Sequence, residues 1–391
     1  MIGIVGAGLS GLTAALSLQA RGVSCALFEG SSKVGGRVKS DRYEGYILDH
    51  GFQVLLDSYP LLSEFSRMKD LQLEAFDPGA RIYSAQGDLH RISDPLRQPS
   101  ALLDTLFSPI GSFTDKLRIL KLRFASTNEP FSTAQYLKEF GFSEKMVEQF
   151  FKPFFSGVFL EKELKSNAEY FLFLYKMFSK GYATLPKSGM GSFSQQLADA
   201  FHGELHLDHK LTQIEDKDPT TLHFSNGKSH SFSKVILALD APSLSFLMPD
   251  LKLDLGKRAV TTYYFTADSE EKKRKSLFLN ASGKGDINHV AVLSDVQPSY
   301  APKGKTLFSV NVLNRNTHSH QEIQEQLQAL DWFSKPLEFL KSYRISYAQP
   351  DQFFMGQKDL STDRIKIAGD FMQTPSIHGS MLSGKIAAQS I

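Results

Sequence analysis

The chain has 391 residues, of which 41% are hydrophobic and 22% are charged. This composition can bury a full-sized core and excludes a disordered chain, and the length is typical of two or three domains. Lysine and arginine total 44 against 42 acidic residues, so the net charge is only +2 and no broad basic surface is available for nucleic acid. The short basic run at 272–275 follows acidic residues, which is typical of a solvated loop. Cys25 is the single cysteine, which excludes an internal disulfide and any multi-cysteine metal site.

Membrane-spanning and secretory signals are not evident in the sequence. No apolar stretch approaches the roughly 18 residues that a spanning helix needs. The chain opens directly in the strand-like MIGIVGAG, without the basic region or cleavage site of a signal peptide. We therefore expect a cytoplasmic protein.

The N-terminal segment predicts a strand, a glycine turn, a helix and a second strand. Residues 2–5 form a short apolar run with β-branched residues, which is typical of a buried parallel strand. Leucines then recur at helical spacing from Leu9, and Gly22 stands where a helix C-cap glycine is expected. A second apolar run, Cys25–Phe28, ends at Glu29. This order indicates a βαβ unit, the opening of a Rossmann-like α/β fold.

The middle of the chain is predicted to be helical and is rich in aromatic residues. Residues 102–180 carry few strand signals, and phenylalanines crowd into one part of this range: Phe140, Phe142, Phe150, Phe151, Phe154, Phe155 and Phe159. Apolar or alternating runs predict strands at 204–207, 221–224, 235–239, 259–265 and 306–313. A helix is predicted over 320–330, and a last strand at 365–368 precedes a glycine-bearing helix.

Gly6, Gly8 and Gly11 form a G-x-G-x-x-G pattern between the first strand and the first helix. The first glycine allows the sharp turn, the second lets a pyrophosphate approach the backbone, and the third lets the helix pack on the strand. The helix N-terminus, which includes Ser10, offers N–H groups and positive dipole to phosphates. Glu29 lies about 20 residues further on, where a carboxylate accepts hydrogen bonds from ribose hydroxyls and repels a 2′-phosphate. The pattern predicts a dinucleotide other than NADP; the alternative is a glycine-rich turn in another α/β protein.

A glycine-glycine-arginine element follows at residues 35–37. It resembles the corresponding element of the flavin-dependent amine oxidase, protoporphyrinogen oxidase and phytoene desaturase superfamily. The resemblance implies that Gly36 and Arg37 meet FAD, with the guanidinium on the pyrophosphate. The following Leu-Asp-His-Gly-Phe segment resembles the part of that superfamily that approaches the flavin, which adds Gly51 and Phe52 to the expected cofactor contacts.

Residues 368–370 and 375–384 resemble the last FAD motif of the same superfamily. In that motif an acidic residue contacts the ribityl and pyrophosphate region, and a helix N-terminus points at the pyrimidine edge of the flavin. A helix N-terminus carries roughly half a positive charge, which favours the reduced flavin. The expected contacts in this motif are Gly369, Asp370, Ser376 and Ile377.

The resemblance covers most of the chain and is loosest at 265–363. It implies that Leu211 lies on a strand whose backbone meets the adenine. Because the matching pieces lie at both ends and in the middle, we expect a Rossmann-like FAD-binding domain interleaved with a mixed sheet-plus-helical substrate domain. The expected ranges are 1–75, 187–242 and 356–391 for the FAD-binding domain, and 76–186 and 243–355 for the substrate domain.

The type of flavin chemistry depends on residues that are absent as well as present. The covalent flavin of some amine oxidases needs a C-terminal cysteine, and none follows Cys25, so FAD is expected to be noncovalent. Many amine oxidases carry a lysine near flavin N5, and the strand at 259–265 has none, which disfavours amine oxidation. The aromatic residues of 150–178 indicate an apolar tunnel or, alternatively, the packed core of a helical cap. An amine substrate would instead favour a pair of aromatic side chains that face each other over the flavin. The candidates for such a pair, which are alternatively core residues, are Tyr343, Tyr347, Phe353 and Phe354.

His50 and His378 are the candidate catalytic residues, because both lie in segments that resemble flavin-contacting motifs. Either is a potential proton shuttle that titrates near neutrality, and the alternative is a hydrogen bond that orients a loop. Two pairs of histidines are close enough in sequence to suggest metal ligands: His206 with His209, and His318 with His320. No additional ligand stands at a recognisable motif spacing from either pair, so no metal site is predicted.

Three functions are compatible with these features. The leading hypothesis is an FAD-dependent oxidoreductase that removes hydride from an apolar small molecule, of isoprenoid or carotenoid type, to flavin N5. The second is a flavin amine oxidase. The third is a flavin-free binding protein of the same fold, which the presence of Glu29, Arg37 and Asp370 argues against.

The segment at 107–123, which mixes basic and large apolar residues, is a candidate for contact with the membrane in which an apolar substrate would be dissolved. Its alternation of large apolar residues with lysine and arginine fits an amphipathic helix that sits at a membrane surface. The interpretation that we favour is a solvated helix whose apolar face packs on the rest of the cap. The first possibility implies a cytoplasmic protein in peripheral contact with membranes.

Overall fold

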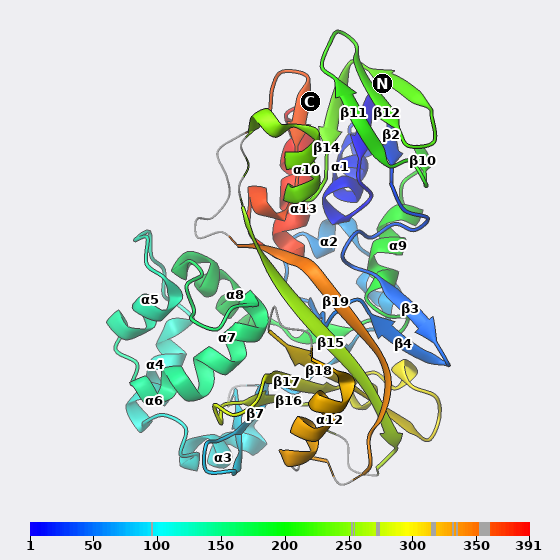
Figure 1. Ribbon diagram of the computed structural model, residues 1–391. Helices are drawn as coiled ribbons and strands as arrows, with labels where there is room; N and C mark the ends of the chain where they lie inside the picture. The colour runs from blue at the N-terminus through cyan, green and yellow to red at the C-terminus, as the bar shows by residue number, and fades with distance from the viewer. Residues whose placement is uncertain are drawn as a thin grey trace.

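The computed structural model describes residues 1–94, 97–251, 253, 255–270, 274–313, 318–330, 332–333, 335–351 and 360–391. Figure 1 shows both chain ends at the top, beside a parallel sheet, and a group of helices at the lower left. Two long strands, β15 (Gly256–Asp268) and β19 (Glu338–Asp351), run side by side from the upper part to the lower part (Figure 1). Within these ranges no helix combines the length and the apolar character needed to cross a bilayer.

A five-stranded parallel sheet contains the predicted N-terminal βαβ unit. Its strands stand in the order β10, β2, β1, β14, β20. Their bounds are Ile2–Val5 for β1, Cys25–Phe28 for β2, Glu204–His206 for β10, Lys234–Leu237 for β14 and Ile365–Ile367 for β20. Every residue of β1 and β2 is buried, as the continuous apolar runs predict for a parallel sheet covered on both faces.

The helices α1 (Leu9–Ala20) and α13 (Ile377–Gln389) pack against each other beside this sheet. Two glycines allow α1 to lie close to its neighbours: Gly11 faces the turn after β1, and Gly384 faces α1 from α13. A Cβ on Gly11 would lie 1.8 Å from the carbonyl oxygen of Gly6, and a Cβ on Gly384 would lie 2.0 Å from a carbonyl oxygen of α1. No larger residue fits either position without moving the backbone.

A second, seven-stranded sheet has the strand order β19, β15, β18, β17, β16, β7, β8. All neighbours are antiparallel except β16 and β7. The remaining bounds are Gly79–Tyr83 for β7, Leu89–Ser93 for β8, Leu277–Asn280 for β16, Ile287–Val292 for β17 and Lys305–Val312 for β18. The strands predicted at 259–265 and 306–313 are confirmed within β15 and β18.

Residues 102–180, named the helical segment from here on, are helical as predicted. The helices are α3 (Leu102–Phe107), α4 (Phe113–Leu122), α5 (Thr133–Glu139), α6 (Glu144–Met146), α7 (Lys152–Phe159) and α8 (Ala168–Lys180). A capping box between Ser112 and Asp115 begins α4, and a π-helical turn at Val147–Phe151 joins α6 to α7. Figure 1 shows this segment beside β15 and the edge of the seven-stranded sheet.

Three small sheets and five helices complete the described chain. The strands are β3 (Ser40–Tyr43) with β4 (Tyr46–Asp49), then β5 (Leu55–Leu56), β6 (Glu74–Ala75) and β9 (Ala183–Leu185), and finally β11 (Leu211–Glu215), β12 (Thr220–Phe224) and β13 (Ser229–Phe232). The helices are α2 (Leu62–Phe65), α9 (Gly191–Asp199), α10 (Ala241–Leu247), α11 (Leu293–Val296) and α12 (His320–Ala329). The expected fold class, a Rossmann-like α/β part interleaved with a mixed sheet-plus-helical part, is confirmed. The domain boundaries stay a prediction, and the boundary at 356 lies outside the described residues.

Candidate active site

The glycine turn lines one end of a large cavity. Gly8 and Gly36 lie next to each other in its wall, and a Cβ on Gly36 would lie 3.2 Å from the Cα of Gly8. Gly36 also has a φ of +58°, a left-handed conformation that glycine adopts without strain. The two backbones form a narrow cradle free of side chains, which suits a phosphate that must approach the main chain closely. Predicted residues that line this end are Gly6, Gly8, Ser10, Glu29, Gly36 and Arg37.

Main-chain groups hold the carboxylate of Glu29 in place at the end of β2. Its Oε2 accepts a hydrogen bond from the N–H of Ala7 at 2.8 Å, and its Oε1 accepts from the N–H and hydroxyl of Ser31 at 2.9 and 2.7 Å. A carboxylate has about four lone-pair sites, so it can accept further donors from a ligand. Glu29 therefore presents a fixed negative charge to the cavity.

Two helix N-termini reach the same cavity. The N-cap of α1 is Gly8, and no side chain caps the first turn, so its N–H groups are open to a ligand. At α13 the hydroxyl of Ser376 accepts from the N–H of Gly379 at 2.9 Å, and Ser376 and Ile377 line the cavity. Two positive helix ends at one cavity favour an anionic cofactor.

Arg37 and Asp370 form an ion pair on the cavity wall. The Nη1–Oδ2 and Nη2–Oδ1 distances are both 2.8 Å, and Nη1 also donates to the carbonyl of Ala348 at 2.9 Å. Burial opposes the charge of Arg37, but the Asp370 carboxylate outweighs this effect and raises the pKa of the guanidinium. Gly369 lines the cavity next to the pair. Together with the glycine cradle, Glu29 and the two helix ends, this arrangement fits a dinucleotide.

The segment that the resemblance places near a flavin lies further along the same wall, where His50, Gly51 and Phe52 line the cavity. His50 Nε2 is 3.0 Å from Asp41 Oδ2, which also accepts the hydroxyl of Tyr343 at 2.8 Å. The Phe52 ring makes an edge contact with the ring of His289 at 4.9 Å between centroids. His50 is thus held by a carboxylate, which suits either role proposed for it.

Three predicted site residues are not among the described residues that line the cavity. Gly11 serves the packing of α1 on β1, and Leu211 is buried in β11. The ring of His378 stacks on Tyr59 and Phe173 at centroid distances of 5.7 and 5.2 Å, and burial lowers its pKa. The cofactor and catalytic roles expected for these three residues stay predictions.

The cavity has a volume of about 820 Å³ and extends from the glycine turn into the helical segment. Phe150, Phe154 and Phe178 line it, whereas Phe151 and Phe171 are fully buried within the helical segment. The aromatic cluster therefore supplies both an apolar cavity wall and a packed core. Both interpretations of this cluster, an apolar tunnel and the packed core of a helical cap, are therefore correct for part of it.

His289, which sequence analysis did not single out, lies on β17 in the cavity wall and is 3% exposed. Its Nδ1 is 2.8 Å from the side-chain oxygen of Asn288, so Nδ1 carries the proton and Nε2 is an acceptor. Nε2 is buried without a hydrogen-bond partner in the described chain. Burial lowers the pKa of His289 to about 3, so the ring is neutral near pH 7. The signal in the sequence was an Asn-His pair at the start of a short, mostly apolar strand.

The features expected of an amine oxidase site are sparse. Lys116, from α4, is the lysine among the described residues that line the cavity. Tyr343 and Tyr347 are not among the lining residues, while Phe353 and Phe354 lie outside the described part of the chain. Across the described ranges, no group of three His, Cys, Asp or Glu side chains is arranged to hold a metal ion.

Solved structures define the class of fold. An oxidoreductase from Methanosarcina mazei superposes with a TM-score of 0.76 at 17% identity, over 99% of this chain and 99% of that chain. A putrescine oxidase with bound putrescine gives a TM-score of 0.74 at 16% identity, over 99% of this chain and 98% of that chain. The described chain thus has the fold of flavin-dependent amine oxidases.

The family follows from the sequence as a whole. The model of the flavin containing amine oxidoreductases matches residues 9–391, and the chain belongs to this family. Protoporphyrinogen oxidase 2 of Arabidopsis thaliana is 28% identical over 164 residues, which cover 40% of this chain and 32% of that protein. The match thus spans about a third of that relative's length. The predicted family and the prediction of a flavin-dependent oxidoreductase are confirmed.

Proposed function

We propose that the chain binds FAD noncovalently at the glycine-lined end of the cavity and removes hydride from an apolar small molecule. The support for FAD is the combination of the Gly8–Gly36 cradle, the fixed carboxylate of Glu29 and the Arg37–Asp370 pair at one wall. A bound flavin supplies the acceptor for two electrons from a substrate C–H bond. Cys25, the only cysteine, is buried in β2, which supports noncovalent binding.

One observation supports the apolar substrate above the others. A single cavity runs from the cofactor residues into the helical segment, where its wall includes Phe150, Phe154 and Phe178. A wall of this kind excludes water and holds a carbon skeleton by burial of apolar surface. The residues here bind and orient the substrate, and exclusion of water protects the reacting C–H bond from competing chemistry.

Amine oxidation is the second candidate, and the family and the putrescine oxidase fold match favour it. The wall gives little support, because Lys116 lies in the helical segment and Tyr343 and Tyr347 do not line the cavity. A flavin-free binding protein is the third, and it leaves the Glu29 and Arg37 arrangement without a role.

Anaerobic substrate screening of the purified protein separates these functions. FAD-loaded protein is mixed with isoprenoid hydrocarbons and alcohols in one series, and with mono- and diamines in another. Bleaching of the flavin absorbance by isoprenoids alone is the expected result. Bleaching by amines, with peroxide release on admission of air, would establish the amine oxidase instead. A colourless protein that takes up no FAD would exclude both enzymes.

We further propose that the helical segment docks on anionic membranes. Phe107, Phe113 and Phe124 are exposed by 82%, 64% and 88%, and Leu117 by 47%. Phe113 and Leu117 also line the cavity, so this apolar surface lies at its mouth. Lys121 is exposed beside it and supplies positive charge for an anionic surface. An apolar substrate dissolved in a bilayer would enter the cavity directly from such a surface.

A further inference from the structure

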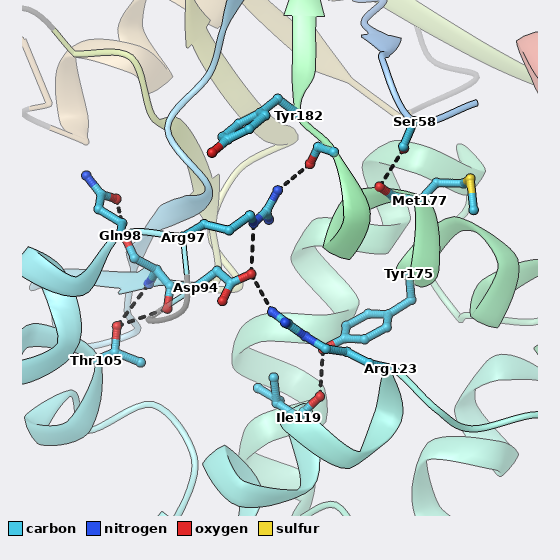
Figure 2. A network of polar contacts seen from close by, with 12 residues as sticks. Ser58, Asp94, Arg97, Gln98, Thr105, Ile119, Arg123, Tyr175, Met177 and Tyr182 are labelled. Carbon is cyan, nitrogen blue, oxygen red and sulfur yellow. Dashed lines mark hydrogen bonds and ion pairs between the residues drawn. The ribbon is translucent and has the colours of Figure 1, made fainter. Parts of the chain in front are cut away.

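A compact charged cluster lies in the cavity wall beside the helical segment. Figure 2 shows the carboxylate of Asp94 between the guanidinium groups of Arg97 and Arg123. Arg97 Nε and Arg123 Nη2 both donate to the same oxygen, Asp94 Oδ2, the former at 2.9 Å. All three side chains line the cavity and are largely shielded, at 12% exposure for Asp94 and 20% and 19% for the arginines.

The two arginines are fixed in place by different elements. Arg97 also donates to the carbonyl of Gly181 and lies over the ring of Tyr182, 5.2 Å from its centroid (Figure 2). Arg123 directly follows α4, and its Nε is buried without a hydrogen-bond partner in the described chain. The guanidinium groups therefore have defined positions and retain donors for a ligand.

The charges at this end of the cavity do not balance. Two guanidinium groups share the carboxylate of Asp94, and Lys116 adds a third cation whose ammonium donates to the carbonyls of Leu106 and Ser108 at 2.8 Å each. Among the other acidic side chains, Asp115 interacts with Lys116 but also lies 3.8 Å from Arg118, and Asp77 accepts from Ser276 at 3.3 Å and interacts with Arg81.

The surroundings make this excess charge significant. Leu120, Phe154 and Phe178 line the same cavity. Positive charge in such a setting is costly unless an anion completes the arrangement.

We propose that Arg97 and Arg123 form a binding site for the carboxylate of the substrate, which is therefore an apolar carboxylic acid. This inference rests on the proposed function and makes its substrate class more specific. Guanidinium groups suit a carboxylate because their planar N–H donors match its two oxygens. The cavity also explains selection: its apolar wall takes the carbon skeleton, and its cationic end repels amines while it attracts acids.

Binding to the FAD-loaded protein tests the proposal without turnover. Farnesoic acid and farnesol share one isoprenoid skeleton and differ in the charged end. Isothermal titration is expected to give the acid about 10-fold tighter binding or more, since charge-assisted hydrogen bonds contribute roughly 1.5–3 kcal/mol each. Arg97→Gln combined with Arg123→Gln should remove this preference and leave farnesol affinity unchanged, which also shows that the variant is folded.

Two further variants sharpen the test. Asp94→Asn removes the competing carboxylate, so the acid should bind more tightly while farnesol does not. Arg118→Gln is the matched control, because Arg118 is on α4, five residues before Arg123, but lies 3.8 Å from Asp115 and does not line the cavity.

Equal affinities for acid and alcohol in the parent protein would overturn the carboxylate site and leave the apolar substrate standing. An unchanged acid preference in the double variant would also overturn it. If neither ligand binds, the apolar substrate falls together with the carboxylate site.

Discussion

Arg37 and Asp370 are 333 residues apart in the sequence and form a two-point ion pair, with both N–O distances at 2.8 Å. Arg37 follows the N-terminal βαβ unit, and Asp370 follows the last strand of the same sheet. Asp370 is almost fully buried, whereas Arg37 retains 34% exposure of its side chain. The pair thus joins the two halves of the cofactor end and leaves part of the guanidinium open to a phosphate.

Replacement of Arg37 by lysine is expected to weaken FAD binding and to lower stability. An ammonium cannot reproduce both hydrogen bonds to the buried Asp370 carboxylate. The loss of one partner from a largely buried pair costs on the order of 2 kcal/mol when the other partner is partly exposed. FAD titration and urea unfolding measure the two effects. Unchanged FAD affinity would contradict the pyrophosphate role, and Asp370→Asn in the same background should add little further loss.

Glu29→Gln should reduce FAD affinity about 10- to 100-fold. The charge-assisted hydrogen bonds from the ribose are replaced by weaker ones, a change worth roughly 1.5–3 kcal/mol. Glu204→Gln is the control, because that side chain is exposed on the neighbouring strand β10. Fluorescence quenching of added FAD gives both constants. Equal FAD affinity for the Glu29 variant and the parent would refute the ribose assignment.

Co-sedimentation with vesicles tests docking of the helical segment. The protein should bind vesicles of phosphatidylcholine with phosphatidylglycerol, and high salt should weaken the binding because Lys121 and its neighbours contribute through charge. Phe107→Ser with Phe113→Ser should abolish it. Phe246→Ser is the matched control, since Phe246 is equally exposed at 82% on the distant helix α10. Loss of binding in the control as well, or binding to none of the vesicles, would disprove this docking surface.

The pH dependence of stability should reveal two buried groups with opposite effects. Burial raises the pKa of Asp49 to about 6, so its contribution to stability is full below pH 4 and is lost as the pH rises through 6. Burial lowers the pKa of His289 to about 3, so its contribution is full above pH 6.5 and is lost as the pH falls. Between pH 4 and 6 the two trends oppose each other.

Asp49→Asn removes the loss of stability that the Asp49 carboxyl causes as the pH rises, and leaves the gain that His289 causes. Relative to the parent, the unfolding free energy of the variant should therefore gain about 2 kcal/mol between pH 4 and pH 6. Urea unfolding at the two pH values measures the difference. Asp70→Asn, at an exposed position, should leave the profile of the parent unchanged. Parallel profiles for the Asp49 variant and the parent would show that this carboxyl is not protonated preferentially in the folded protein.

Much of the sheet that carries the cofactor end could be predicted because its signals are local. The strand at 2–5, the glycine turn and the helix from Leu9 are encoded by adjacent residues, and the last strand at 365–368 is a short apolar run. β19 was missed because it is an edge strand that alternates charged and aromatic residues. Its 14-residue length depends on pairing with β15, which no local pattern reveals.

The cavity was less accessible to sequence analysis. Asp94 and Arg97 are only three residues apart, but Arg123 lies 29 residues after Asp94, and nothing in this spacing predicts that the two guanidinium groups share one oxygen. His289 gave a weak signal, because it follows Asn288 in a short, mostly apolar strand; its burial and its ring contact with Phe52 are properties of the folded chain. The division of the phenylalanines between wall and core also depends on which face each helix presents, a property of tertiary packing.

The position of β14 between β1 and β20 has a consequence for biosynthesis. The βαβ unit that starts the sheet leaves the ribosome hundreds of residues before β20 and α13, which complete it. Until then the face of α1 that receives Gly384 is uncovered. We expect the cofactor end to fold only after translation of residues 365–389, so that stalled nascent chains lacking them remain sensitive to protease throughout this region. FAD can then be acquired only after residues 365–389 have been made.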